Sequence, residues 1–376
     1  MTKTNRIYGL DLLRAIAILS VIYSHSFFLV VDHINERAYT FFSLDGVTLF
    51  FVLSGFLIGG ILLKTISGTS FTSLDLLGFW IRRWFRTLPN YFFILILLIF
   101  LAVIMGKPLP SNLFSYFFFC QNFASPHPAF FPEAWSLSVE EWFYLLIPAG
   151  LFFSIKFFGK SKERAILWWV VITILAVTLL RIIRAVHYHF PDFESWDNYQ
   201  RKLVITRLDS IMYGFLGAWL SFYRKEAWLR HKKLLFASGL ILLFYPRVHE
   251  TLFGQDLFFN NYFSLSITSL ATLLMLPALS QLRSGKGIIY RFLTFVSIVS
   301  YSMYLVNFSL IQLTIIPSLS RSIVIFTTNQ LIISIFRYTI YWVFTFAFAY
   351  LLYTFFEKPM MELRERFGKQ QKSAKA

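Results

Sequence analysis

The 376-residue chain has almost no cysteine and little charge. Its one cysteine, Cys120, cannot form an intramolecular disulfide and leaves no cysteine-based zinc site. Only 14% of the residues are charged, against roughly a quarter in an ordinary soluble domain. Hydrophobic residues make up 57% and aromatic residues 20%, which excludes a disordered chain. This composition argues against a soluble globular enzyme and favours a chain surrounded by lipid.

Long hydrophobic runs divide the sequence. A helix needs about 20 apolar residues to cross about 30 Å of hydrocarbon. The pattern predicts an all-α, polytopic membrane protein with about ten transmembrane helices. The first is expected to stay in place rather than be cleaved as a signal peptide, because Asp11 and Arg14 interrupt it. The predicted spans are residues 10–31, 44–63, 91–106, 135–155, 165–186, 203–223, 234–245, 262–282, 292–316 and 331–356.

The basic residues are distributed unevenly between the two sides. With the N-terminus inside, the cytosolic segments hold 24 Lys and Arg and the outer segments hold six. The positive-inside rule then predicts an N-in, C-in topology. We expect a multi-pass protein of the cell inner (plasma) membrane. The net charge of +16 therefore reflects topology, and no nucleic-acid partner is expected.

We expect two parts of unequal size. Residues 1–360 form one transmembrane domain, with no soluble domain appended at either end. Residues 361–376 form a basic cytosolic tail attracted to anionic membrane lipid.

The first span carries two residues that stand out. Arg14 and His25 are eleven residues apart, so they share one helical face about 16 Å apart. Ionisable groups inside a membrane usually mark a functional interior. Two alternatives remain open at this point. Asp11 could simply pair with Arg14, and His25 could be a core histidine satisfied by a neighbouring helix.

Carboxylates lie at a depth similar to that of His25. Glu140 in the fourth span and Asp209 in the sixth are both near the outer edge. A carboxylate within reach would favour the protonated form of the histidine and orient its ring, as in a tuned general base. Other charged residues could instead be helix-end groups that reach the interface, namely Arg184, Arg337 and Asp45.

A basic and aromatic stretch precedes the third span. Arg83 and Arg86 are three apart on one helical face, and arginine suits bidentate contact with phosphate. The alternative is that these residues only set topology and anchor the helix at the interface.

An ordered set of motifs runs along the whole ten-span region. These motifs are GLDLLR at 9–14 with His25 after ten residues, GVTLFFVLSGFL at 46–57, RWFR at 83–86, WSLSVE at 135–140, RLD at 207–209 with Gly214, SYSMYL at 300–305 and EKP at 357–359. Taken together they resemble the acyltransferase-3 family of integral membrane O-acyltransferases.

The resemblance implies a reaction. The chain would move an acyl group, usually acetyl, from cytosolic acyl-CoA to a hydroxyl of an extracytoplasmic or lipid-linked glycan. Acceptors of this kind are O-antigen, capsule, exopolysaccharide and peptidoglycan. Acyl-CoA would be the donor substrate, and no metal is expected.

The resemblance also implies roles for residues. His25 would be the catalytic histidine and Arg14 its motif partner. Arg83 and Arg86 would hold the CoA phosphates. Ser136 and Glu140 would form the polar pair of the fourth helix, Glu140 with a catalytic role and Ser136 at the substrate. We also expect Asp209 and Arg181 near the acceptor. The alternative for the region after Arg181 is a solvated loop without a binding role.

The expected mechanism is general-base catalysis. His25 would remove the hydroxyl proton of the acceptor as its oxygen attacks the thioester carbonyl. An arginine or a backbone N–H would stabilise the oxyanion. An acyl-enzyme on Ser54 or Ser136 stays open.

The sequence departs from the family pattern at two positions. Thr48 stands where the family often has Asp, and Asn307 stands where it often has His, so catalysis is assigned to neither. Some members carry a fused esterase-like domain that this sequence lacks, so transfer is either direct or uses a separate acyl-carrier or esterase-like partner. Other functions remain open, namely acylation of a small molecule such as a macrolide, transport of a glycan or lipid, and a non-catalytic scaffold.

Overall fold

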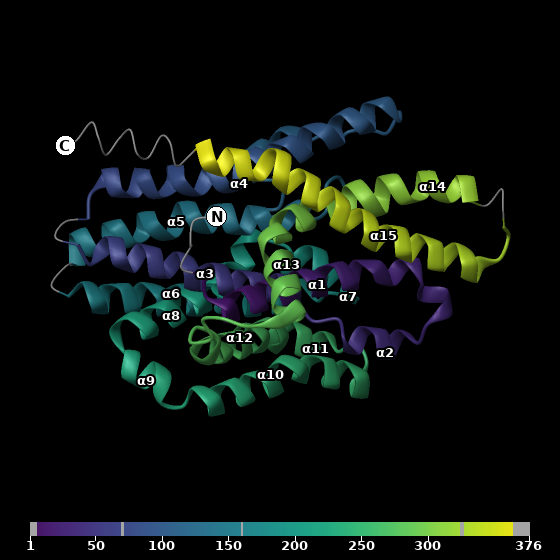
Figure 1. The fold of residues 1–376 in the computed structure, drawn as a ribbon. Coiled ribbons are helices and arrows are strands. Elements are labelled where there is room, and N and C mark those ends of the chain that lie inside the picture. The colour runs from purple at the N-terminus through teal and green to yellow at the C-terminus, as the bar shows by residue number, and fades with distance from the viewer. Residues whose placement is uncertain (1–5, 69–70, 159–160, 324–326, 364–376) are drawn as a thin grey trace.

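The computed structural model describes residues 6–68, 71–158, 161–323 and 327–363 (Figure 1). Within these ranges every regular element is helical, of α, π or 3₁₀ type. Most of the predicted basic tail at 361–376 lies outside the described residues.

Eight described segments are long and apolar enough to cross a membrane. This result confirms the prediction of an all-α polytopic membrane protein. The helices that build these segments are α1 (Tyr8–Ser26), α3 (Gly46–Ile66), α4 (Ser73–Ile104), α5 (Ala134–Phe158), α6 (Lys162–Tyr188), α11 (Leu257–Phe259) with α12 (Leu265–Leu279), α13 (Gly287–Val306) with α14 (Ile316–Ile323), and α15 (Gln330–Leu352).

The two remaining predicted spans correspond to α8 (Leu208–Tyr223) and α10 (Lys232–Phe253). Helix α8 has 16 residues and is mostly buried against its neighbours. Helix α10 has 22 residues, of which only Gly239 and Leu243 are buried, and its second half carries Arg247, His249 and Glu250. Of the ten predicted spans, these two therefore fall short in length or in apolar character.

Shorter elements lie at the ends of the bundle. Helix α9 (Lys225–Arg230) is at one end, and α2 (Glu36–Phe41) and α14 are at the opposite end (Figure 1). The basic α9 belongs to a predicted cytosolic loop, and α2 to a predicted outer one. The other short elements are α7 (Phe193–Trp196), the π segments Asp197–Arg201, Asn260–Ser264, Asn307–Ile315 and Tyr353–Glu357, and the 3₁₀ turns Phe27–Leu29, Val31–His33, Leu113–Phe118 and Val204–Thr206.

Helix α4 corrects the predicted start of the third span. It begins at Ser73, 18 residues before the predicted position 91. A capping box starts the helix early, because Thr72 and Asp75 satisfy each other's backbone N–H groups. Pro89 lies inside the helix without ending it. Arg83 and Arg86 therefore lie on the same continuous helix as the apolar span.

Glycines bring α3 and α8 into very close contact. A Cβ atom at Gly55 would lie 1.8 Å from the carbonyl oxygen of Ile211, and one at Gly214 would lie 1.9 Å from that of Val52. Small residues allow membrane helices to pack backbone against backbone. This pair fixes α3, which lines the candidate site, against the centre of the bundle.

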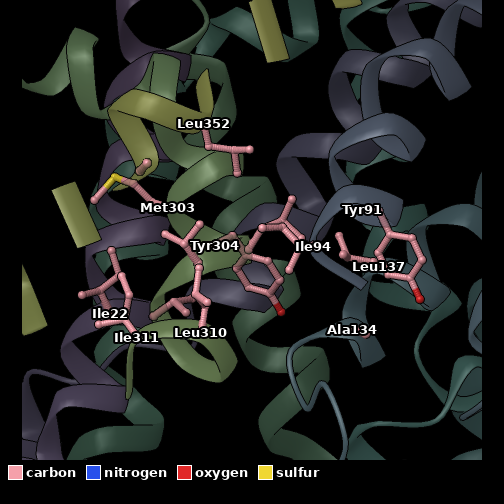
Figure 2. Close-up of a cluster of buried hydrophobic side chains, with 14 of the residues drawn as sticks. Ile22, Tyr91, Ile94, Ala134, Leu137, Met303, Tyr304, Leu310, Ile311 and Leu352 are labelled. Carbon is pink, nitrogen blue, oxygen red and sulfur yellow. The ribbon is translucent and has the colours of Figure 1, made fainter. Parts of the chain in front are cut away.

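A buried apolar cluster packs around the second half of α1. Figure 2 shows side chains of α1, α4, α5, α13 and the π segment Asn307–Ile315 converging. Ile22, Tyr91, Met303 and Ile311 are almost fully buried. The cluster therefore holds the end of α1 against α13 and the π segment that follows it.

Candidate active site

One cavity gathers residues from five helices. Arg14 of α1, Arg83 and Arg86 of α4, and Ser136 and Glu140 of α5 all line it. The structure thus brings together five of the predicted site residues that are far apart in the sequence. Other polar groups on the lining are Ser54, Thr87, Ser300, Tyr301 and Tyr304.

Arg14 forms a long ion pair with Asp11 but no hydrogen bond to it. Asp11 instead receives two hydrogen bonds from Arg6, at 2.9 and 2.7 Å. The closest approach of Arg14 to Asp11 is 3.9 Å. Among the described residues the Arg14 guanidinium has no hydrogen bond, and its side chain is 20% exposed. The local pair with Asp11, the alternative raised by the sequence, is therefore present as an ion pair without a hydrogen bond, because Asp11 is hydrogen-bonded to Arg6.

Tyr144 links three residues on the wall of the cavity. Its hydroxyl donates to Glu140 Oε2 at 3.0 Å and accepts from Arg83 Nη2. Ser54 Oγ lies 2.6 Å from the same hydroxyl. The Arg83 guanidinium also lies 4.2 Å from the centre of the Tyr144 ring. These contacts fix the direction of the Glu140 carboxylate.

Ser136 is held by a second tyrosine. Tyr304 donates its hydroxyl proton to the carbonyl oxygen of Glu133 at 3.0 Å. Ser136 Oγ lies 2.6 Å from the Tyr304 oxygen. Because the tyrosine proton is already used, Ser136 is the donor in this pair.

His25 lies at the end of α1 but does not line the cavity. Its Nδ1 is 2.6 Å from Oδ1 of Asn307. The ring packs against Phe308 with a centroid separation of 4.3 Å. The carboxylate expected beside His25 is not its partner among the described residues, since a neutral amide fills that place.

A buried carboxyl group fixes the π segment that carries Asn307. Ser309 donates to Glu133 from its backbone nitrogen at 3.0 Å and from its hydroxyl at 2.5 Å. Burial raises the pKa of the Glu133 carboxyl to about 7, although the Ser309 hydrogen bonds oppose this. Glu133 precedes α5, so it ties α5 to the segment facing α1.

The two predicted acceptor residues Arg181 and Asp209 pair with each other. Arg181 Nη1 lies 2.6 Å from Asp209 Oδ2, and both side chains are almost completely buried. Arg181 also donates to Ser266 Oγ at 2.7 Å. Neither residue lines the cavity, so their role in binding an acceptor stays a prediction.

The other charged residues of the spans also have specific partners. Asp45 caps α3, because its carboxylate accepts hydrogen bonds from the backbone N–H and the hydroxyl of Thr48. The Thr48 hydroxyl in turn accepts a hydrogen bond from Arg207 Nη2 at 2.7 Å. Arg337 donates to Ser320 Oγ, and Arg184 to the carbonyl oxygen of Tyr199. Asp45 is therefore a partly buried cap at the start of its helix.

Sequence reasoning missed Tyr144, Tyr304 and the contact of Asn307. Tyr144 follows Glu140 by four residues, so helical spacing could have found it. Tyr304 lies within the SYSMYL motif, but nothing in the sequence indicated that it contacts Ser136. The position of Asn307 depends on the π segment, which no apolar periodicity reveals.

Comparison with known proteins identifies similar sequences. The model of the acyltransferase-3 family, described as "Acyltransferase domain", matches residues 7–354. A protein of Staphylococcus aureus (strain COL) named "Putative O-acetyltransferase SACOL0978" is 28% identical over 337 residues, which cover 82% of this chain and 51% of that protein. "Peptidoglycan O-acetyltransferase OatA" of Listeria monocytogenes is 32% identical over 180 residues, which cover 43% of this chain and 27% of that protein.

The chain therefore spans about half the length of the staphylococcal relative. No solved structure matches the chain.

Proposed function

Because this chain belongs to the acyltransferase-3 family, we propose that it is a membrane O-acetyltransferase that moves an acetyl group from cytosolic acetyl-CoA to a hydroxyl of a cell-surface glycan. The observation that carries the proposal is the cavity in which Arg14, Arg83 and Arg86 meet Ser136 and Glu140. We place the protein in the inner (plasma) membrane, where a donor on one side can serve an acceptor on the other.

The three arginines suit the phosphates of the donor. A guanidinium group presents a fork of donors that matches phosphate oxygens. Arg14 has no hydrogen bond among the described residues, and Arg83 Nε is a buried donor without a partner there. A bound phosphate would satisfy such groups, which supports acyl-CoA as the donor.

His25 supplies the base in the proposed reaction. Its Nε2 takes the proton of the acceptor hydroxyl while the hydroxyl oxygen bonds to the carbonyl carbon of the thioester. The carbon–sulfur bond then breaks, and the CoA thiolate leaves and takes the proton from the imidazolium. The products are an acetyl ester and CoA thiol, and the histidine returns to its neutral form.

Direct transfer is favoured over an acyl-enzyme. A serine nucleophile needs a base hydrogen-bonded to its hydroxyl. Ser54 and Ser136 each contact a tyrosine hydroxyl instead, at 2.6 Å. His25 is therefore proposed to act on the acceptor and not on either serine.

Peptidoglycan is the acceptor we propose first, because one relative is named a peptidoglycan O-acetyltransferase. In a two-protein version of the same reaction, the hydroxyl acetylated by this chain would belong to a separate acyl-carrier or esterase-like partner. O-antigen, capsule and exopolysaccharide are the other acceptors, and a small molecule such as a macrolide is the runner-up.

The test uses the full chain in a host that lacks its own glycan O-acetyltransferase. Cells receive acetate labelled with carbon-13, and peptidoglycan and other surface glycans are analysed by mass spectrometry. The proposal predicts that sugars gain one labelled acetyl group only when the chain is expressed. Unchanged glycans with acetylation of a supplied macrolide would identify the runner-up, and no labelled product at all would refute the proposed activity.

A further inference from the structure

The π segment Asn307–Ile315 meets the end of α1 at His25. Three of its residues make the contact: Asn307 reaches the ring nitrogen Nδ1, Phe308 packs on the ring, and Gln312 Nε2 donates to the His25 carbonyl oxygen at 2.9 Å. π-helical turns are rare and occur often at functional sites. The segment therefore holds both the side chain and the backbone of His25.

The amide of Asn307 can have only one orientation. Its Nδ2 lies 2.9 Å from the carbonyl oxygen of Met303 and 2.7 Å from that of Tyr304. Both neighbours are acceptors, so both amide protons are used there. A flipped amide would place its oxygen against two carbonyl oxygens, which the hydrogen-bond network excludes.

The oxygen of Asn307 therefore faces His25. Oδ1 is 2.6 Å from His25 Nδ1 and 3.2 Å from the hydroxyl of Tyr341. An amide oxygen accepts and cannot donate, so the proton of this short contact belongs to the imidazole. The histidine carries a hydrogen on Nδ1, and in its neutral form Nε2 holds a lone pair.

Asn307 is itself buried and fixed. Its side chain is completely inaccessible, and Glu133 anchors the segment two residues further on through Ser309. Nε2 of His25 has no hydrogen-bond partner in the described part of the chain, and the His25 side chain is only partly buried. One ring nitrogen is thus locked by the protein while the other stays available.

We propose that Asn307 is a positioning residue that holds His25 in the Nδ1–H tautomer and so directs the lone pair of Nε2 toward the acceptor hydroxyl. This inference rests on the proposed function, in which Nε2 takes the proton of the acceptor. A neutral amide does this without adding a charge to the buried end of α1. Asn307 does not touch substrate, so it acts only through His25.

The tautomer can be measured without any turnover. Nitrogen-15 NMR of histidine-labelled protein in detergent micelles separates protonated from unprotonated ring nitrogens, and coupling to the ring protons tells Nδ1 from Nε2. The spectrum of His25→Ala identifies the His25 signal. The proposal predicts that in the unmodified protein the unprotonated nitrogen is Nε2. A proton on Nε2 would overturn the proposal.

A matched pair of variants distinguishes the effect of the Asn307 amide from that of the other hydrogen bond to its oxygen. Asn307→Leu keeps the size of the side chain and removes the acceptor of the Nδ1 proton. Tyr341→Phe removes the other hydrogen bond to the same oxygen and leaves the acceptor in place. For Asn307→Leu we expect kcat to fall about 100-fold, the scale of general-base catalysis, while KM for acetyl-CoA stays within about twofold. Tyr341→Phe should stay within about twofold of the unmodified protein in both.

The kinetic and NMR measurements distinguish failure of the Asn307 role from failure of the proposed function. An Asn307→Leu protein that keeps full kcat would overturn the positioning role even if the glycan assay succeeds. If the unmodified protein acetylates no acceptor but its NMR signal shows the Nδ1–H tautomer, the proposed function fails while the structural effect of Asn307 is supported. If Asn307→Leu does not fold, the NMR measurement of the His25 tautomer in the unmodified protein still tests the proposal.

Discussion

Tyr144 donates its hydroxyl proton to Oε2 of Glu140 at 3.0 Å, one helical turn earlier on α5. The same hydroxyl accepts from Arg83 of α4. A single oxygen atom therefore connects an arginine predicted to bind the donor with a carboxylate predicted to take part in catalysis. Both residues line the cavity, where Arg83 Nη2 also lies 3.9 Å from Glu140 Oε2 in a direct ion pair.

Replacing Tyr144 with phenylalanine should impair the reaction while preserving the fold. Tyr144→Phe keeps the buried ring but leaves Glu140 and Arg83 without their shared partner. Loss of a hydrogen bond to a charged group costs about 1.5–3 kcal/mol, so kcat/KM should fall about tenfold or more. Initial rates with labelled acetyl-CoA measure this. Tyr350→Phe, at an exposed site on α15, is the control, and an equal loss there would remove the special role of Tyr144.

Arg14 should contribute to binding of the donor. Arg14→Ala removes a guanidinium that lines the cavity without a hydrogen bond among the described residues. If the group binds a phosphate, KM for acetyl-CoA should rise about tenfold, as expected for one charge-assisted contact. Arg82→Ala is the control, because Arg82 is exposed on α4 and outside the cavity lining. A KM unchanged in Arg14→Ala, or raised equally in Arg82→Ala, would contradict this assignment.

The contact between α3 and α8 should be sensitive to a single methyl group. Gly55→Ala would place Cβ 1.8 Å from a backbone oxygen, whereas Gly60→Ala on the same helix meets nothing within 4 Å. We expect Gly55→Ala to lower the free energy of unfolding by about 1–3 kcal/mol, as overpacking does. Gly60→Ala should be neutral or stabilising by up to about 1 kcal/mol, because alanine favours the helix. Thermal unfolding in detergent compares them, and equal midpoints would contradict the close packing.

The sequence predicted most of the fold because membrane spans obey a simple rule of length and apolar character. It also placed Arg83 and Arg86 on one helical face, and both line the cavity. The start of α4 was wrong because Thr72 and Asp75 begin the helix within a polar stretch. Hydropathy measures how favourably residues transfer from water to lipid, and it contains no information about helix-capping hydrogen bonds.

The partners of buried charges could not be predicted in the same way. Arg181 and Asp209 were interpreted as acceptor ligands because ionisable residues in a span usually indicate function. Their pairing joins α6 to α8, and which helices are neighbours is a property of the three-dimensional packing. The contact of Asn307 with His25 depends on a π segment, which changes the side-chain register after Val306.

The topology can be tested at the single cysteine. Cys120 lies in the connection between α4 and α5, predicted to be on the outer side, and it is exposed. A membrane-impermeant maleimide should therefore label intact cells. The matched control places a cysteine on the other side, with Ser67→Cys in a Cys120→Ser background, and it should be labelled only after the membrane is opened. The reverse pattern would contradict the predicted N-in, C-in orientation.

The most direct measurement is the acetyl content of surface glycan in cells that express His25→Ala. His33→Ala is the matched control, because His33 is exposed in the 3₁₀ turn Val31–His33. Both variants are compared at equal amounts of inserted protein. Loss of a general base lowers rates about 10²–10⁴-fold, so we predict that His25→Ala glycan carries no acetyl above the background of cells without the chain and His33→Ala glycan is acetylated normally. Acetylation by His25→Ala at the level of the unmodified protein would contradict the assignment of the base.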